Sequence, residues 1–211
     1  VLNAGTTVFY SGDATTRSEV VDTIEKASLT KVERFFRRNK ARKLTRILGA
    51  SEKIATEPIP ACYVAVVHTD AIPVFQAMEG FIPVEKYASG KHVHANEIGT
   101  VGAFRVLASA NFNPIEKAGA SSATNMSGGK GSAPATAEKC DVYSCVCFGA
   151  DAYAVTPLKG REAIQMNVYP PGKPTPGNEL GQKGFVSWSM FDAAMITNEL
   201  WVARIEFAIE A

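Results

Sequence analysis

The sequence predicts an α+β fold in which helices flank a central sheet and strands dominate the last third of the chain. A helix with its own start signal begins at Thr30, and a nearly continuous apolar strand from Cys62 to Val67 is followed at once by another helix start. From residue 140 to 211 the sequence alternates as β-strands do. With 211 residues, the chain can bury a substantial core as one large or two small domains.

The N-terminal part is expected to supply one strand and a connection. Residues 6–10 are typical of a short strand, which the sequence Ser11-Gly12-Asp13 ends. Residues 17–26 favour a weak helix or an ordered connection.

The next element is a helix that starts at Thr30. The Thr30 side chain can accept a hydrogen bond from the free amide of Glu33, and the Glu33 carboxylate can accept one from the Thr30 amide. This reciprocal pair is a capping box. At about 100° per residue, Val32, Phe35 and Phe36 share one face of this helix.

The helical pattern breaks between residues 39 and 42, because Lys43 would otherwise fall on the apolar face. A shorter element is expected to follow, carrying Leu44, Ile47 and Leu48.

This region holds a local excess of positive charge, although the net charge of the chain is only +1. Four arginines fan over the polar side of the helix: Arg34, Arg37, Arg38 and Arg42. They can form a solvated face of an amphipathic helix. Alternatively, they contact phosphates, because clustered cations release counterions from nucleic acid. Both interpretations stay open, and bulk charge does not argue for a nucleic-acid protein.

The middle of the chain alternates strands, helices and loops. The apolar run 62–67 is typical of a central strand buried on both faces. Residues 69–73 predict a helix start, with Val74, Phe75 and Met78 facing inward. Further on, Gly99 and Gly102 indicate a tight turn or a close backbone approach.

Two segments are expected to be loops. Residues 118–137 are dominated by Gly, Ser, Ala and Thr; Lys130 is followed by Gly131 rather than Ser or Thr, so a surface loop is favoured over a phosphate-binding loop. Residues 170–177 contain four prolines and predict a spacer between strands.

Candidate chemical groups have simpler structural interpretations. The cysteines, namely Cys62, Cys140, Cys145 and Cys147, lack the paired spacing of zinc ligands and predict buried thiols. His92 and His94 lie in an exposed-looking segment where Glu97 is the nearby carboxylate, and a metal-binding role for them is not favoured. His68 with Asp70 is the best candidate for an active-site pair, but a structural His68 that bonds a local amide is favoured.

The acidic residues of the last third are expected to stand singly: Glu162, Glu179, Glu199 and Glu206. We therefore assign no catalytic residue, no metal ligand and no cofactor. No apolar run reaches the roughly 18 residues of a membrane helix, and no signal peptide is visible at the start. A start without Met suggests a processed, truncated or partly recorded chain.

Five segments in order resemble the major capsid proteins of tailed bacteriophages, in the podophage-type family with the Hong Kong 97-type fold. They are the helix 30–39, the strand end 64–70, and residues 97–102, 148–153 and 181–184 before Trp188. The resemblance implies an axial domain over residues 30–156, with a central sheet flanked by helices. It also implies peripheral-domain return strands over 157–211 and a connection from the peripheral domain and spine region over 1–29.

The family carries an N-terminal arm, an extended loop and a spine helix ahead of the position that matches Leu2 to Gly5, and none precedes Val1. This segment alone is therefore not expected to close a shell. The family often has Asp-Pro-Leu and Lys where this chain has residues 178–180 and Ser189, which bears on the branch within the family.

The resemblance implies a structural protein rather than an enzyme: a capsid subunit that self-assembles, as pentamers and hexamers, into the icosahedral head shell around double-stranded DNA. It implies the virion capsid as location, assembly in the host cytoplasm, no membrane, and scaffold, portal and cement proteins as further partners. In such a shell, the basic face would contact a neighbouring subunit's acidic surface or the packaged DNA, through Arg34, Arg37, Arg38 and Arg42. A rival is a nucleic-acid-binding module that uses the basic helix 31–42, which predicts salt-sensitive binding. An enzyme built around His68 and Asp70 is a third alternative.

Overall fold

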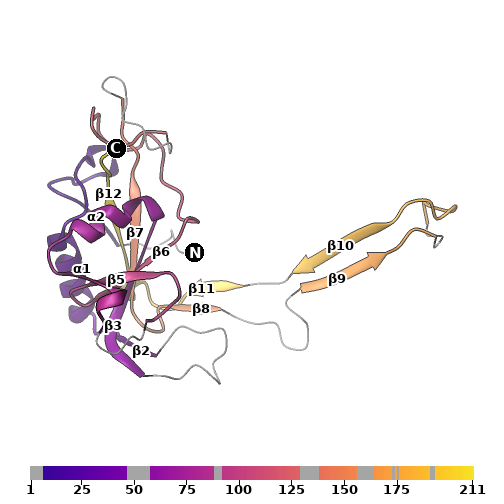
Figure 1. The fold of residues 1–211 in the computed structure, drawn as a ribbon, viewed down its shortest axis with the longest axis horizontal. Helices are drawn as coiled ribbons and strands as arrows, with labels where there is room; N and C mark the ends of the chain where they lie inside the picture. The colour runs from indigo at the N-terminus through magenta and orange to yellow at the C-terminus, as the bar shows by residue number, and fades with distance from the viewer. Residues whose placement is uncertain are drawn as a thin grey trace. The chain divides into compact units, whose positions relative to one another are not determined.

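The structure is a computed structural model that describes residues 7–46, 58–87, 92–128, 138–155, 164–172, 174, 176–190 and 193–211. The chain divides into two compact units (Figure 1). Unit 1 comprises Val1–Ala152 and Thr197–Ala211, and unit 2 comprises Tyr153–Ile196.

Within the described residues, unit 1 contains one mixed sheet of eight strands. Seven of them lie side by side in the order β1 (Val8–Tyr10), β12 (Val202–Phe207), β7 (Tyr143–Phe148), β3 (Pro58–Val67), β6 (Phe104–Ala108), β5 (Glu97–Val101) and β4 (Phe81–Pro83). The eighth, β2 (Leu44–Arg46), pairs with β3. β1 runs parallel to β12 and β3 parallel to β6, whereas the other pairs are antiparallel.

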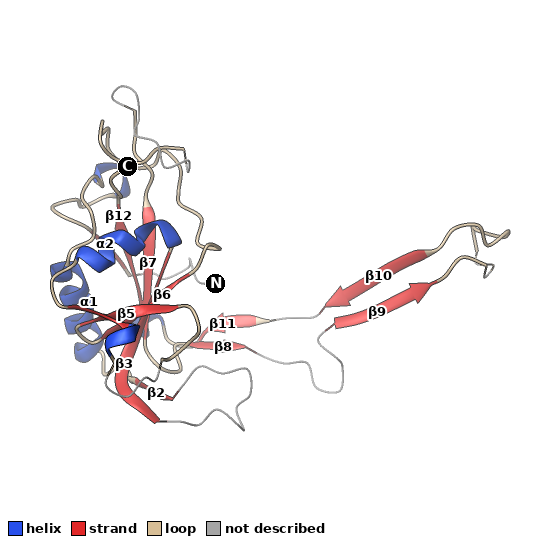
Figure 2. Cartoon of the chain, viewed as in Figure 1, coloured by secondary structure: helices blue, strands red, loops and turns tan. Residues whose placement is uncertain are grey.

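β3 is the central strand that its apolar sequence predicts. Tyr63, Ala65 and Val67 belong to the main core on one face, and Val64 packs on the other face with Val93. Both α-helices of the described chain, α1 (Lys26–Arg38) and α2 (Ile72–Ala77), cover the same face (Figure 2). The expectation of a central strand buried on both sides is confirmed, although the helices described here cover one side of it.

α1 begins at Lys26, four residues earlier than expected, so the capping box at Thr30 is wrong. The Thr30 hydroxyl donates to the carbonyl of Lys26 at 3.0 Å, and Glu33 forms an ion pair with Arg37 at 2.5 Å. The physical reason is the buried Leu29, which extends the apolar stripe toward the N-terminus by one turn. Burial of that turn outweighs a local side-chain cap.

The expected break after the helix is confirmed. α1 ends at Arg38, and Lys40 has a φ of 54°, in the left-handed region that stops a helix. The basic helix is therefore Lys26–Arg38 rather than 31–42, and Arg42 lies beyond its end. Of the shorter element expected next, Leu44 lies in β2, whereas Ile47 and Leu48 lie outside the described residues.

The apolar face of α1 packs on the sheet through aromatic rings. Val32 and Phe36 are fully buried, and the Phe36 ring lies 5.1 Å from that of Tyr63. Phe104 of β6 completes the group at 5.6 Å from Tyr63. These contacts fix α1 against the middle of the sheet.

Shorter helical turns link the remaining elements of unit 1: η1 (Arg17–Glu19), η2 (Thr69–Ala71), η3 (Val84–Lys86) and η4 (Glu199–Trp201). η2 leads into α2, where Phe75 is buried and Val74 and Met78 are partly buried, as expected. Gly102 turns the chain between β5 and β6 with a φ of 59°, which confirms the turn predicted there.

The first and last segments of unit 1 differ from the expected domain plan. Residues 8–29 do more than connect, because β1 extends the sheet and Val20 and Ile24 are buried. β12 was expected among peripheral return strands, yet it lies between β1 and β7. The reason is its apolar content on the helix-covered face, where Ile205 and Phe207 are fully buried.

Unit 2 consists of two antiparallel ladders. β8 (Tyr153–Val155) pairs with β11 (Ala194–Ile196), and β9 (Ile164–Tyr169) pairs with β10 (Phe185–Met190). The proline-rich segment 170–177 falls between β9 and β10, which confirms it as a spacer between strands. Residues 129–137 of the other predicted loop lie outside the described residues.

β12 carries a fully buried carboxylate, Glu206, on the sheet face opposite the helices. It accepts hydrogen bonds from Arg17 Nε at 2.8 Å and Nη2 at 2.7 Å, and Arg204 Nη2 lies 3.0 Å away. The hydrogen bond to Glu206 raises the pKa of the Arg17 guanidinium. Glu206 thus has two arginine partners, which its position as the single acidic residue of the strand did not reveal.

We expect Glu206→Gln to destabilise unit 1 by about 2 kcal/mol, because the largely buried Arg204 and the 40% exposed Arg17 would then face a neutral group. Urea unfolding monitored by circular dichroism measures the loss. The matched control is Glu116→Gln at an exposed position, which should change stability by less than about 0.5 kcal/mol. Equal stability of the two variants would show that the buried charge is dispensable.

Candidate functional site

His68 and Asp70 are brought together, but as a turn rather than a reactive pair. His68 caps η2, and its Nδ1 accepts a hydrogen bond from the Asp70 amide at 3.1 Å. The Asp70 carboxylate accepts from the Tyr143 hydroxyl at 3.2 Å. Burial raises the pKa of the Tyr143 hydroxyl, and the charge of the nearby Asp70 carboxylate raises that pKa further. The predicted structural role of His68 is thus confirmed, and each group has a partner in the fold.

The four cysteines are buried, as expected, and are not disulfide-bonded. Cys145 and Cys147 face the main core from β7 with sulfur atoms 3.8 Å apart, whereas Cys62 and Cys140 lie in other clusters. Burial raises the pKa of the Cys62 and Cys140 thiols, which keeps them protonated near neutral pH.

His92 and His94 are exposed. Glu97, the carboxylate nearest to them in sequence, is occupied elsewhere: it accepts from Tyr87, Arg105 and the Val93 amide. In the part of the chain that the structure describes, no three metal-binding side chains gather at one point.

The most conspicuous surface of the chain is one face of the β9–β10 ladder. The register places Val186 opposite Val168 and Trp188 opposite Met166, so these four side chains lie on the same face. Met190 follows on that face. All five are exposed, with 70% of Trp188 and 67% of Met166 accessible. We call these five residues the apolar hairpin face.

The opposite face of the same ladder is mostly polar. It carries Gln165 and Asn167 on β9, with Ser189 and Ser187 directly across on β10. Only the pair Tyr169 and Phe185 at the turn end is aromatic, and their rings stack at 4.6 Å. The ladder is therefore amphipathic, with its apolar side uncovered by the described chain.

An uncovered apolar ladder of this kind has a physical consequence. A two-stranded sheet is marginally stable in water on its own, because half of its backbone groups and one apolar face lack partners. Contiguous exposed apolar patches on proteins mark surfaces that another chain or element covers. The apolar hairpin face is thus a candidate contact surface.

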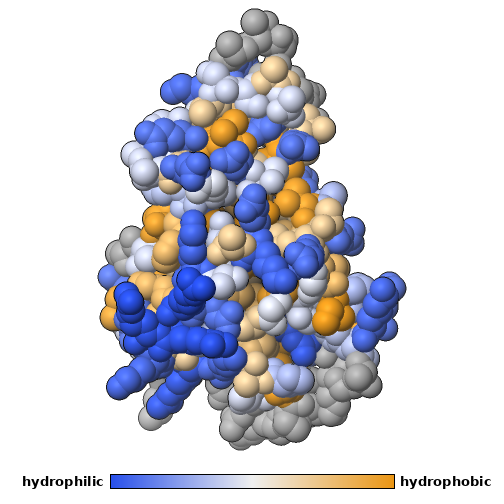
Figure 3. Space-filling view, turned by 90° about the vertical axis from the view of Figure 1, so that its left-hand side faces the viewer, coloured by the Kyte–Doolittle hydropathy of each residue, from blue (hydrophilic) through white to orange (hydrophobic). Residues whose placement is uncertain are grey.

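A second surface is the polar side of α1. Arg34, Arg37 and Arg38 are exposed on it, with Arg37 paired to Glu33. Figure 3 looks onto the side of unit 1 that carries α1 in Figure 1, and strongly hydrophilic side chains gather there. Arg42 lies apart from this helix and faces Asp151 at 3.7 Å. The structure therefore groups three of the four predicted arginines on one helix.

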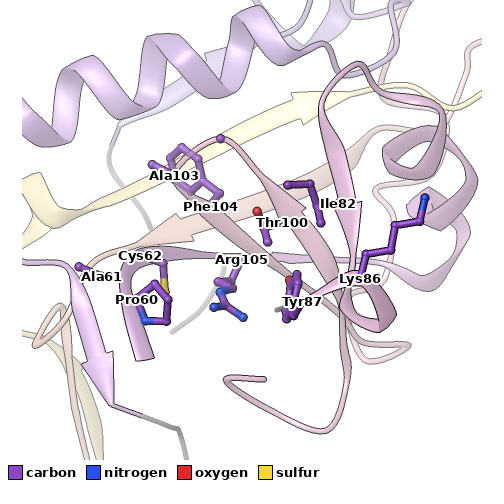
Figure 4. A pocket seen from close by; sticks show the side chains of 11 residues that line it. Pro60, Ala61, Cys62, Ile82, Lys86, Tyr87, Thr100, Ala103, Phe104 and Arg105 are labelled. Atoms are coloured by element: carbon purple, nitrogen blue, oxygen red, sulfur yellow. The ribbon is translucent and has the colours of Figure 1, made fainter. Parts of the chain in front are cut away.

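A hollow of about 540 Å³ opens beside β3 and β6 (Figure 4). Pro60 and Cys62 line it from β3, and Lys86 and Tyr87 line it from the segment after β4. Arg105 of β6 lies between them.

Two polar side chains of this hollow, those of Tyr87 and Arg105, are already engaged. Glu97 accepts from the Tyr87 hydroxyl at 2.7 Å and from Arg105 Nη1 at 2.8 Å. The Arg105 guanidinium also lies 4.5 Å from the centre of the Tyr87 ring. Burial and the hydrogen bond to Glu97 raise the pKa of Tyr87. This network ties the segment before β5 to the sheet, which is a structural role.

Sequence reasoning missed three of these features. The partners of Glu206 and Glu97 lie far away in the chain or on a neighbouring strand, so spacing did not reveal them. The apolar hairpin face was missed for another reason. Alternation in 164–169 and 185–190 was visible, but only the register shows that the apolar residues of both strands share a face.

Among the residues that the structure describes, no helix is long and apolar enough to span a bilayer. No model of a known protein family matches the sequence.

The chain is 26% identical to the major capsid protein of Pseudomonas phage KPP21. The alignment of 225 residues covers 98% of this chain and 54% of that protein, so the chain spans about half the length of the curated relative it matches.

Two solved phage structures are similar to this one. The capsid of Ralstonia phage GP4 gives a TM-score of 0.59 at 11% identity, over 97% of this chain and 53% of that chain. The head structure of Helicobacter pylori bacteriophage KHP40 gives a TM-score of 0.50 at 13% identity, over 97% of this chain and 60% of that chain. The chain thus resembles a phage major capsid protein in sequence over nearly its whole length and shares the fold of phage capsid proteins, as its motifs led us to expect.

Proposed function

We propose that this chain is part of a major capsid subunit that self-assembles into the icosahedral head shell of a tailed phage and encloses double-stranded DNA. The observation that carries the proposal is the apolar hairpin face, which the described chain leaves exposed. The similarity to a phage major capsid protein supplies the class of assembly in which such a face becomes covered.

The mechanism is geometric. Each subunit contributes moderate contact surfaces, and symmetry repeats every contact across the shell. Fully burying a large apolar side chain stabilises a contact by roughly 1.5 to 3 kcal/mol. Burial of Trp188 and its neighbours would therefore favour contact between copies. The polar side of the ladder can stay in water when that contact forms.

We further propose the Hong Kong 97-type fold and the podophage-type branch for this chain. Unit 1, with its helix-covered sheet, corresponds to the axial domain, and unit 2, with its antiparallel ladders, belongs to the peripheral domain. In this assignment β12 returns to the axial domain. Pentamers and hexamers of the chain, packaged DNA, and scaffold, portal and cement proteins are the proposed partners, with assembly in the host cytoplasm.

The basic face of α1 favours one second candidate, a nucleic-acid-binding module. Clustered arginines on one helix suit phosphates. Its aromatic residues do not suit bases, because Phe36 is buried and Phe35 packs against Phe9 at 5.8 Å. The capsid role accounts for both units, whereas DNA binding accounts for one face of one helix.

Electron microscopy of particles purified from the source of the chain tests the proposal. We expect icosahedral shells that contain this polypeptide, identified by mass spectrometry of the same fraction. Recovery of the polypeptide solely as a soluble monomer from cells free of phage would contradict the capsid role.

A substitution in the apolar hairpin face tests the observation behind the proposal. We expect Trp188→Ser to lower the association constant of the contact at least tenfold, because the lost burial is worth more than about 1.4 kcal/mol per contact. Sedimentation velocity of the full-length subunit measures assembly. The tryptophan emission of the unmutated protein should also shift to shorter wavelength on assembly, because Trp188 becomes buried while Trp201 stays in unit 1.

The matched control is Ser187→Thr, on the polar face of the same strand. This variant should assemble as the unmutated protein does. Normal assembly of Trp188→Ser would remove the apolar hairpin face from the contacts of the shell.

A further inference from the structure

We infer that the two ends of α1 dock head to tail between copies, with a basic hollow of one copy on an acidic hollow of the next. The inference rests on the proposed function, because it assigns a contact within that assembly. Both hollows belong to unit 1 and involve residues of the same helix.

The basic hollow, of about 480 Å³, lies along the C-terminal half of α1. It is lined by Phe9, Lys31, Arg34, Phe35, Arg37 and Arg38. Glu33 neutralises Arg37, whereas Lys31, Arg34 and Arg38 have no ion-pair partner within the described ranges. Three exposed cations therefore surround this hollow without a countercharge.

The floor of the basic hollow is aromatic. Phe9 and Phe35 are both partly buried and meet edge to face at 5.8 Å. A folded protein surface can cover such a floor with apolar side chains, whereas a DNA duplex offers it only phosphates and sugars. The floor thus favours a protein occupant over DNA.

The acidic hollow, of about 470 Å³, lies at the other end of α1. Glu25, Glu79 and Glu210 line it together with one lysine, Lys26. The three glutamates are exposed, and none has an ion-pair partner among the residues described. Its apolar lining comes from Ile24, Ala27, Val74, Ala77 and Met78.

The two hollows are opposite in charge, and each has an apolar component. They cannot meet within one molecule, because α1 is a rigid helix and residues 26 and 38 are roughly 18 Å apart along its axis. A contact between the two hollows therefore joins two copies of the chain. A contact between two different surfaces of the same chain is heterologous, and repetition about an axis closes it into a ring.

The helix dipole does not account for this arrangement. It favours acidic groups near the N-terminus of α1 and basic groups near its C-terminus. It does not explain why both charged sets surround hollows with apolar linings, nor why Glu79 and Glu210 come from other parts of the chain.

A charge-swap experiment tests the inference on the full-length subunit. The double variant Arg34→Glu, Arg38→Glu makes both hollows acidic, and Glu25→Lys, Glu79→Lys makes both basic. We expect each to lower the assembled fraction at least about tenfold, measured by sedimentation velocity at physiological salt. The quadruple variant restores opposite charges with reversed polarity and should recover most of the assembly.

Two control variants change charge elsewhere on unit 1. Lys139→Glu and Glu116→Lys are exposed and line neither hollow, so they should assemble normally. Circular dichroism and urea unfolding verify that every variant keeps the fold, which separates loss of contact from loss of structure.

The outcomes distinguish this inference from the proposed function. If the unmutated protein forms shells and both charge-reversed doubles do too, the head-to-tail contact is overturned while the capsid role stands. If the unmutated protein forms no shell, the capsid role itself fails. If the quadruple variant does not recover assembly, and the arginine variant instead loses salt-dependent binding to duplex DNA, the occupant of the basic hollow is DNA and the inference is overturned.

Discussion

The pairing of β7 with β12 is the constraint on which the rest of the structure depends. These strands are antiparallel neighbours in the sheet, yet the 53 residues 149–201 lie between the end of β7 and the start of β12. The chain leaves the sheet after β7 and must return beside it. The Thr197 amide donates to the Ala152 carbonyl at 2.9 Å, so the outgoing and returning segments are joined where unit 2 begins and ends. Unit 2 is therefore an insertion between two adjacent strands.

This constraint explains why charges are buried near β12. Because β1 and β7 flank it, β12 has no free edge, and its side chains face either the helices or the opposite layer. Glu206 lies on that opposite face and is neutralised by Arg17, which arrives from the N-terminal segment. The ion pair thus couples the start of unit 1 to its last strand. Burial of the carboxylate is tolerable because both of its oxygens accept hydrogen bonds.

Local patterns predicted the individual elements well. The apolar run of β3, the turn at Gly102 and the end of α1 followed from residue types within a few positions. The start of α1 did not, because a capping box at Thr30 competes with the burial of Leu29, and only the packed sheet decides between them. The position of β12 in the sheet could not be predicted from local patterns either, since strand order depends on contacts between distant residues.

The candidate surfaces were predictable in part. Charge clustering identified Arg34, Arg37 and Arg38, because like charges on one helix are visible in sequence. The acidic hollow was not, since Glu25, Glu79 and Glu210 come together only through the fold. The family resemblance depended on the order of packing motifs, and it predicted the fold of phage capsid proteins.

The register of β9 and β10 has a consequence for how this region can change during evolution. Apolar residues oppose apolar residues on both strands, so sliding one strand by a single position sends half of them to the polar side. The segment from Pro170 to Gly184 joins the strands and so helps to set that register. Sequence drift there is limited at Gly172, Gly177 and Gly181, whose positive φ angles favour glycine, and at Asn178, whose side chain bonds Lys183, so the turns that hold the two sides distinct depend on a few positions.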